Sequence, residues 1–173
     1  MNKLNSKYMN LIVRKQWATA YATPEFITIN TCSGFRSSAR DPLGEEFFFS
    51  WDVSDEVLGA GIVSSLTASR LLEPDQIGMF FDLSFIKENY EKWVEKLIEK
   101  YNYKSRRALF KNMKHCMIER VDGVMTIKPT NHEKLEGWGG KGVKHEDYKI
   151  LDETVQVEEI GRSLRDCFAK CIG

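Results

Sequence analysis

The stretch from Lys114 to Gly142, KHCMIERVDGVMTIKPTNHEKLEGWGGKG, decides the fold because it begins with the clearest β-hairpin in the chain. Its Asp122-Gly123 dipeptide separates two runs that contain no other glycine, and no proline before Pro129. A type I′ turn requires positive φ at both central residues, and Asp-Gly is one of the pairs that favour it. The sequence therefore predicts a hairpin with a two-residue loop, in which Val121 pairs with Val124.

This register gives the hairpin one apolar and one polar face. The next predicted pairs are Arg120–Met125, Glu119–Thr126 and Ile118–Ile127. The apolar face holds Ile118, Ile127, Met125 and the stem of Arg120, and the polar face holds Glu119, Thr126 and Lys128. Antiparallel sheets commonly bury one face and leave the other in water. The pattern leaves open whether the hairpin lies at an edge of the sheet or in its interior.

The totals indicate one domain spanning residues 1–173. Hydrophobic residues make up 42% and charged residues 29%, an ordinary globular composition. Lys+Arg and Asp+Glu both number 25, and a net charge of zero argues against a dedicated nucleic-acid binder. No run is apolar for long enough to act as a signal peptide or a membrane span, so we expect a cytoplasmic protein. In that compartment the four cysteines are expected to stay reduced.

The remaining segments mix strands with helices. Residues 17–21 and 26–30 favour a strand pair, although a helix over residues 9–18 is an alternative. Strands are also expected at 45–53, 79–83 and 145–152, and residues 71–78 are expected to form a linker. Helices are expected after a Ser54 cap, after a Ser84 cap over 85–101, within 105–113 as a short helix or turn, and over 153–172. Gly59 and Gly61 in the first helix are expected to let it approach the sheet. The order predicts an α+β fold, a mostly antiparallel curved sheet packed with three to four helices.

Tests for catalytic and ligand-binding motifs give negative results. The loop of residues 137–142 has Leu135 where a phosphate loop needs its first glycine and Gly142 where it needs Ser or Thr. Residues 132–136 carry Glu136 in place of the second histidine of a zinc-protease helix and are expected to form a polar helical turn. His115 and Cys116 are adjacent on a strand and point to opposite faces. We therefore predict no catalytic, metal or cofactor-binding residue and no enzyme, but a binding protein.

Several segments carry a family resemblance. They are residues 14–17 (RKQW), 33–37 (SGFRS), 50–59 (SWDVSDEVLG), 68–70 (ASR), 80–83 (FFDL), 111–113 (KNM) and 132–138 (HEKLEGW). Together they resemble the immunity proteins of bacterial contact-dependent growth inhibition (CDI) systems, over about residues 7–140. The resemblance implies a small cytoplasmic α/β protein that binds the C-terminal toxin domain of a large secreted exoprotein. In the branch concerned the toxins are nucleases, some of them metal-dependent DNases, and some complexes form by β-augmentation.

The expected toxin contacts lie in two places. One is the loop of Trp138, Gly139, Gly140 and Lys141, with the tryptophan as its aromatic anchor. The other is the polar hairpin face at Glu119 and Thr126. Two alternatives remain: a small enzyme of nucleotide or RNA metabolism using His115, His132 and Lys141, and a nucleic-acid-binding module using Arg106, Arg107, Lys111 and Lys114.

Overall fold

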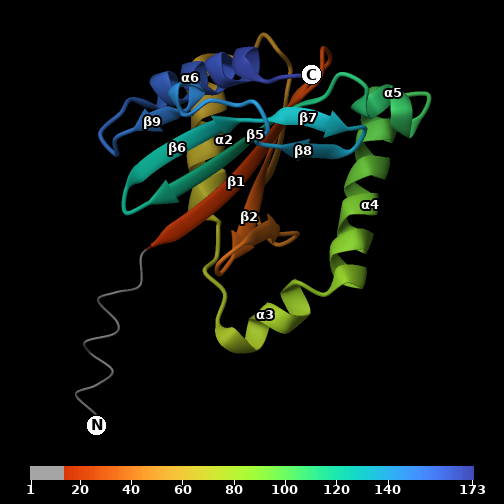
Figure 1. Cartoon of the computed structure of the whole chain (residues 1–173), viewed down its shortest axis with the longest axis horizontal. Coiled ribbons are helices and arrows are strands. Elements are labelled where there is room, and N and C mark those ends of the chain that lie inside the picture. Colours follow the sequence, from red (N-terminus) through yellow and green to blue (C-terminus); the bar gives the residue numbers. More distant parts are fainter. Residues whose placement is uncertain (1–13) are drawn as a thin grey trace.

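The predicted hairpin lies inside an antiparallel sheet in the computed structural model, which describes residues 14–173 (Figure 1). The strand order is β3-β2-β1-β5-β6-β9, and β4 also pairs with β2. The strands are β1 (Lys15–Ala22), β2 (Ile27–Gly34), β3 (Ser38–Arg40), β4 (Glu46–Phe49), β5 (Lys114–Val121), β6 (Val124–Pro129) and β9 (Lys149–Leu151). A separate two-stranded sheet joins β7 (Asn131–Lys134) to β8 (Gly137–Gly139).

The helices are α2 (Asp55–Thr67), α3 (Pro74–Phe80), α4 (Leu83–Tyr101), α5 (Arg106–Phe110) and α6 (Val157–Lys170), with a 3-10 turn η1 (His145–Asp147). The α+β prediction is confirmed. Residues 14–173 hold five α-helices rather than three to four, because α3 is an additional short one, while α5 lies where a short helix or turn was expected. Within this part of the chain, no helix has the length and apolar character that crossing a membrane requires.

The hairpin has the predicted register. Val121 pairs with Val124, Glu119 with Thr126 and Ile118 with Ile127. Asp122 and Gly123 have φ angles of 48° and 86°, as the type I′ turn requires. The hairpin is interior: β5 lies between β1 and β6, and β6 between β5 and β9. The alternative of a helix over residues 9–18 is wrong for residues 15–18, which belong to strand β1. Residues 9–13 lie outside the described part.

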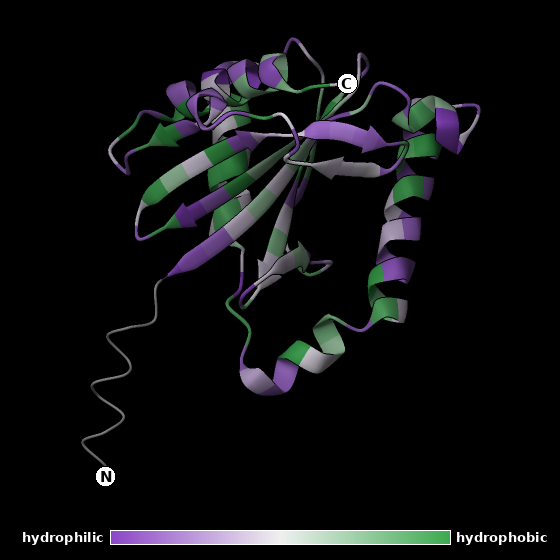
Figure 2. Ribbon diagram, viewed as in Figure 1, coloured by the Kyte–Doolittle hydropathy of each residue, from purple (hydrophilic) through white to green (hydrophobic). Residues whose placement is uncertain are grey.

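Helices α2 and α6 cover one face of the sheet (Figure 1). Ser54 caps α2 as predicted, accepting a hydrogen bond from the Val57 amide. The buried layer includes Leu58, Ile62 and Leu66 of α2, Leu164 and Phe168 of α6, and Ile118, Met125 and Ile127 of the hairpin. In Figure 2 a paler band separates green bands along β6, as expected of a strand in a sheet with one apolar face.

The two covering helices touch through glycines. A Cβ on Gly59 would lie 1.9 Å from the Val157 carbonyl oxygen, and one on Gly161 would lie 2.0 Å from that of Asp55. Only Gly61 serves the close approach to the sheet that was expected of both α2 glycines, since its nearest neighbour is the Phe49 ring of β4. The expectation for Gly59 was therefore wrong, because the helix-to-helix contact needs the missing side chain.

Helices α3, α4 and α5 form the second half of the molecule, beside the opposite face of the sheet (Figure 1). Trp93, Val94 and Leu97 of α4 pack with residues of α5 and with Phe26 in a second core. The predicted linker at 71–78 and strand at 79–83 are wrong. Pro74 occupies the first turn of α3, a Glu73–Gln76 capping box starts that helix, and Asp82 rather than Ser84 caps α4.

Three other boundaries differ from prediction. Strand β4 ends at Phe49, because Ser50 to Val53 turn the chain into α2. Residues 131–136 form β7 and a turn instead of a helical turn, and the first half of the predicted loop at 137–142 is β8. In the C-terminal segment β9 covers only 149–151, and α6 is shorter than predicted at both ends.

A candidate partner-binding cleft

A cleft of about 300 Å³ lies between the uncovered face of the sheet and α4. Its floor comes from alternate residues of β1, whose other residues point into the helix-covered core. Trp17, Thr19 and Tyr21 line the cleft, while Ala18, Ala20 and Ala22 are buried against α2 and α6. The wall is formed by Phe85, Ile86, Asn89 and Tyr90 of α4, and β5 adds His115, Met117 and Glu119. Because β1 alternates in this way, one strand serves both the core and the cleft.

Large apolar side chains remain exposed at the mouth of the cleft. Met117 on the sheet is 53% exposed and Phe85 on α4 is 38% exposed. Leu83 and Met79, at the junction of α4 and α3 and outside the cleft lining, are 81% and 77% exposed. Exposed apolar side chains gathered at one opening mark an interaction surface more often than scattered ones do.

Charged groups on the cleft lining are held in fixed positions. The Arg40 guanidinium lies 3.8 Å from the centre of the Trp93 ring and donates to Asn30 Oδ1 at 3.2 Å. Glu119 and Lys128 form an ion pair between β5 and β6. The lining therefore offers an aromatic and apolar floor with a cation on one side and a paired carboxylate on the other.

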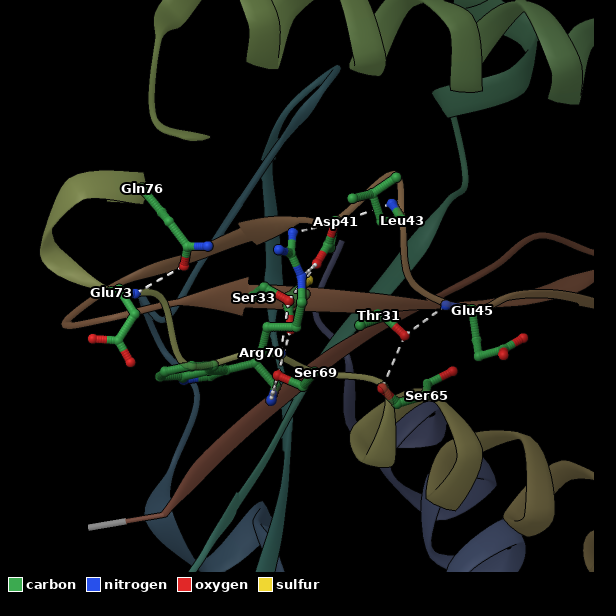
Figure 3. A network of polar contacts seen from close by, with 12 residues as sticks. Thr31, Ser33, Asp41, Leu43, Glu45, Ser65, Ser69, Arg70, Glu73 and Gln76 are labelled. Carbon is green, nitrogen blue, oxygen red and sulfur yellow. Dashed lines mark hydrogen bonds and ion pairs between the residues drawn. The ribbon is translucent and has the colours of Figure 1, made fainter. Parts of the chain in front are cut away.

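An ion pair with a buried carboxylate fixes the turn that follows Arg40 (Figure 3). Asp41, with a side chain that is 0% exposed, accepts from Arg70 Nε at 2.7 Å and from Ser33 Oγ at 2.6 Å. Burial alone raises the pKa of a carboxyl group, but the hydrogen bonds from Arg70 and Ser33 outweigh it and lower the pKa of Asp41. Asp41 is consequently an anion at neutral pH, and its ion pair ties β2 and β3 to the chain leaving α2.

The inner end of the cleft is closed by an aromatic cluster around Tyr21. Its ring centre lies 4.9 Å from that of Trp93, 4.6 Å from that of His115 and 5.3 Å from that of Trp138. The Trp138 indole donates to the Met113 carbonyl oxygen at 3.0 Å. Trp138 is therefore a half-buried support that ties β8 to the loop after α5.

His115 is held as a neutral imidazole. The Thr130 hydroxyl donates to the His115 carbonyl oxygen at 2.7 Å, so its oxygen accepts from Nδ1–H, and Nε2 accepts from the Thr19 hydroxyl at 2.6 Å. Burial, together with the nearby positive charge of Arg40, lowers the pKa of His115 to about 3. An imidazole with both nitrogens occupied has no free site for a substrate proton, which argues against the enzyme alternative.

The basic residues of the nucleic-acid alternative do not form a free patch. Arg106 bonds to Glu136 and Glu91, and these hydrogen bonds raise its pKa. The Lys114 ammonium donates to the Phe168 carbonyl oxygen at 3.0 Å. Two of the four proposed phosphate contacts are thus engaged within the protein. Residues 14–173 also contain no cluster of His, Cys, Asp or Glu suited to a metal ion.

The predicted site residues are divided between the cleft and its surroundings. Glu119 lines the cleft, and Thr126 pairs with it on the same face of the sheet. Trp138 lies behind the cleft, and Gly139 packs against the Glu133 carboxylate. Gly140 and Lys141 are exposed beyond β8. Contact of these six residues with a partner stays a prediction.

Sequence reasoning missed Trp17, Tyr21, Phe85 and Met117 as cleft residues. The alternation of large side chains with alanines in residues 17–21 was visible, but it did not reveal that β5 lies beside β1 or that α4 stands over both.

A family model and a curated relative that match this chain carry the same description. The family model "CdiI: CDI immunity protein" matches residues 16–171. Immunity protein CdiI-YPIII of Yersinia pseudotuberculosis serotype O:3 (strain YPIII) is 41% identical over 177 residues, covering 95% of this chain and all of that protein.

Two solved structures share the fold. The CdiA-CT/CdiI toxin and immunity complex from Yersinia pseudotuberculosis contains a chain that matches with a TM-score of 0.84 and 38% identity, covering 92% of this chain and 99% of that one. A protein of unknown function from Neisseria meningitidis matches with a TM-score of 0.86 and 36% identity, covering 91% and 96%. With a family match over nearly its whole length and a relative above 40% identity, this chain belongs to the CDI immunity protein family.

Proposed function

We propose that this chain binds and neutralises the C-terminal toxin domain of a cognate CDI exoprotein, in the cytoplasm of the cell that makes both. It acts as a stoichiometric inhibitor and not as an enzyme. Family membership and the relative seen in a toxin and immunity complex support this proposal. The observation that carries the choice of surface is the cleft under α4, with Met117 and Phe85 exposed at its mouth.

The toxin segment that enters the cleft is expected to bring apolar side chains. Met117 and Phe85 expose apolar surface above a floor that Trp17 and Tyr21 form, and burying aromatic and apolar groups supplies most of the energy at protein interfaces. Arg40 and the Glu119–Lys128 pair then select the charges of the partner. Because an inhibitor has to hold a catalytic toxin for a long time, we expect nanomolar or tighter binding, about −12 kcal/mol.

A toxin strand could extend the sheet only at one of its edges, and the hairpin does not lie at an edge. Strands β5 and β6 both have neighbours on each side, so an added strand cannot pair with residues 118 and 119. Strand β3 ends the strand order beside β2, and its residues Ser38 to Arg40 line the cleft. We place β-augmentation by the toxin at β3. The proposal that the toxin is a nuclease, and a metal-dependent DNase among the choices, is supported by the sequence resemblance.

The test is titration calorimetry of the purified chain with the toxin domain encoded next to it, followed by a nuclease assay of that domain. The wild-type chain is expected to bind one to one and to abolish nuclease activity. Met117→Glu places a charge in the apolar mouth and should weaken binding by about 2 kcal/mol, roughly 30-fold.

Val57→Glu is the matched control, because Val57 is a comparably exposed apolar residue on α2, away from the cleft. Equal losses in the two variants would remove the cleft from the interface. A failure of the wild-type chain to bind its cognate toxin domain would overturn the function itself.

A further inference from the structure

Two thiols that are far apart in the chain meet beneath the end of α6. Cys116 on β5 and Cys171 are 55 positions apart, and their Sγ atoms lie 3.8 Å from each other. A disulfide bond measures about 2.05 Å, so the two sulfur atoms need to approach by less than about 2 Å to form one. All four cysteines of the chain are free thiols.

The backbone on each side of this pair is fixed. Cys116 is buried in the sheet between β1 and β6. Cys171 is the residue at which α6 ends, with an extended backbone (φ −61°, ψ 142°) that leads the chain away from the helix. The next amide, that of Ile172, donates to the Thr130 carbonyl oxygen at 3.1 Å. The separation of the sulfurs is consequently set by the fold.

The two thiols lie in different surroundings. Cys116 is enclosed, and burial raises its pKa well above the usual value. Cys171 is partly exposed, and the hydrogen bond with the Cys116 thiol is the main cause that lowers its pKa to about 7, helped by backbone hydrogen bonds and the positive charge of Lys114. Because the thiolate is the reactive form of cysteine, Cys171 is the nucleophile of the pair and Cys116 the resolving thiol.

We propose that Cys116 and Cys171 are a redox-active pair that a hydroperoxide converts to an intramolecular disulfide. The Cys171 thiolate attacks the peroxide oxygen, the O–O bond breaks, and a sulfenic acid forms while the peroxide leaves as an alcohol or, from hydrogen peroxide, as water. The Cys116 thiol then attacks the sulfenic sulfur, the S–S bond forms, and the sulfenic oxygen leaves as water. Two thiols are oxidised and one peroxide is reduced.

Cys167 provides a comparison within the same helix. It lies one turn before Cys171, but it is buried, its Sγ donates to the Ile127 carbonyl oxygen at 3.4 Å, and burial raises its pKa to about 12. We expect it to stay reduced. Cys32 is also buried, and burial raises its pKa to about 12 as well.

Trypsin separates the thiols cleanly. Cleavage after lysine and arginine places Cys116 in residues 115–120, Cys167 in 166–170 and Cys171 in 171–173. The whole protein is treated with hydrogen peroxide, denatured, alkylated and digested for mass spectrometry. The expected product is peptide 115–120 linked to 171–173, with Cys32 and Cys167 alkylated. The intact protein should lose two hydrogen atoms and recover them with dithiothreitol.

Cross-linking should also raise the melting temperature by roughly 10 °C, because a long loop is closed in the unfolded chain. The Cys171→Ser variant should lose both the linked peptide and the shift, and Cys32→Ser should keep both. A link from residues 115–120 to 166–170, a disulfide between two molecules, or over-oxidised Cys171 beside a free Cys116 would each overturn the proposal. None of these readouts depends on toxin binding.

Discussion

The two faces of the sheet are built from the same strands, but one packs into the core and the other borders the cleft. On one face, alanines of β1 and the hairpin residues Ile118 and Ile127 are sealed beneath α2 and α6. On the other, Trp17, Tyr21 and Met117 border a cleft that α4 only partly covers. The closed face provides most of the apolar burial that stabilises a domain. The open face leaves Met117 and the Glu119–Lys128 pair accessible, so changes to the two faces should separate stability from recognition.

The largest expected effect is on the closed face. Ile62→Ala removes a fully buried side chain between α2 and the sheet and should lower the free energy of unfolding by about 4 kcal/mol, measured by urea denaturation. The toxin affinity of the protein that remains folded should not change. A loss of affinity without loss of stability would contradict the division between the faces.

Trp138→Ala tests the support behind the cleft. The indole contacts Tyr21, Phe110, His115 and His132 and bonds to Met113, so truncation should cost about 3 kcal/mol of stability. A direct toxin contact at this residue would instead lower affinity while leaving the urea midpoint in place. Measuring both quantities on one variant decides between the two roles.

The glycine contact between the covering helices gives a slightly smaller effect. Gly161→Ala should lower stability by about 2 kcal/mol, since its Cβ would meet the Asp55 carbonyl oxygen and push α6 away from α2. Gly140→Ala is the control, because a Cβ there meets nothing within 4 Å. Equal thermal midpoints for the two variants would show that the helices can separate without cost.

The smallest effect concerns His115 and pH. Its pKa in the folded protein is about 3, below the value near 6.5 of an unfolded chain, so acid protonates the unfolded state first. Its contribution to stability is complete above pH 6.5 and declines as pH falls toward 3. Between pH 7 and pH 5 we expect a loss of about 1 to 2 kcal/mol, measured by urea denaturation at each pH. In His115→Gln this part of the decline should disappear, and an unchanged pH profile would rule it out.

Local signals predicted the elements that local chemistry controls. Asp122-Gly123 defined a hairpin whose register is confirmed pair by pair, and Ser54 defined the start of α2. The prediction for the segment from Pro74 to Leu83 was wrong. Proline and glycine suggested a linker, while the capping residues Glu73 and Asp82 were overlooked.

The cleft needed information that the sequence pattern does not contain. Its floor requires β1 beside β5, and its wall requires α4 across from both, and these are contacts between distant segments. Glu119 was identified because it belongs to the polar hairpin face. Trp138 was expected to anchor a partner, since an isolated tryptophan between glycines gives no sign of the aromatic cluster that holds it.

The interior position of the hairpin has a consequence for timing in the cell. Strand β1 pairs with β5, so Trp17 cannot pair until Glu119, about a hundred positions later, has been synthesised. Ribosomes add about 5 to 20 residues per second, and long-range strand pairing is among the slower steps of folding. A nascent chain therefore has neither cleft nor covered core until most of it has been translated. A cell that makes the toxin needs a standing supply of finished inhibitor, because synthesis begun after exposure yields protection only with a delay.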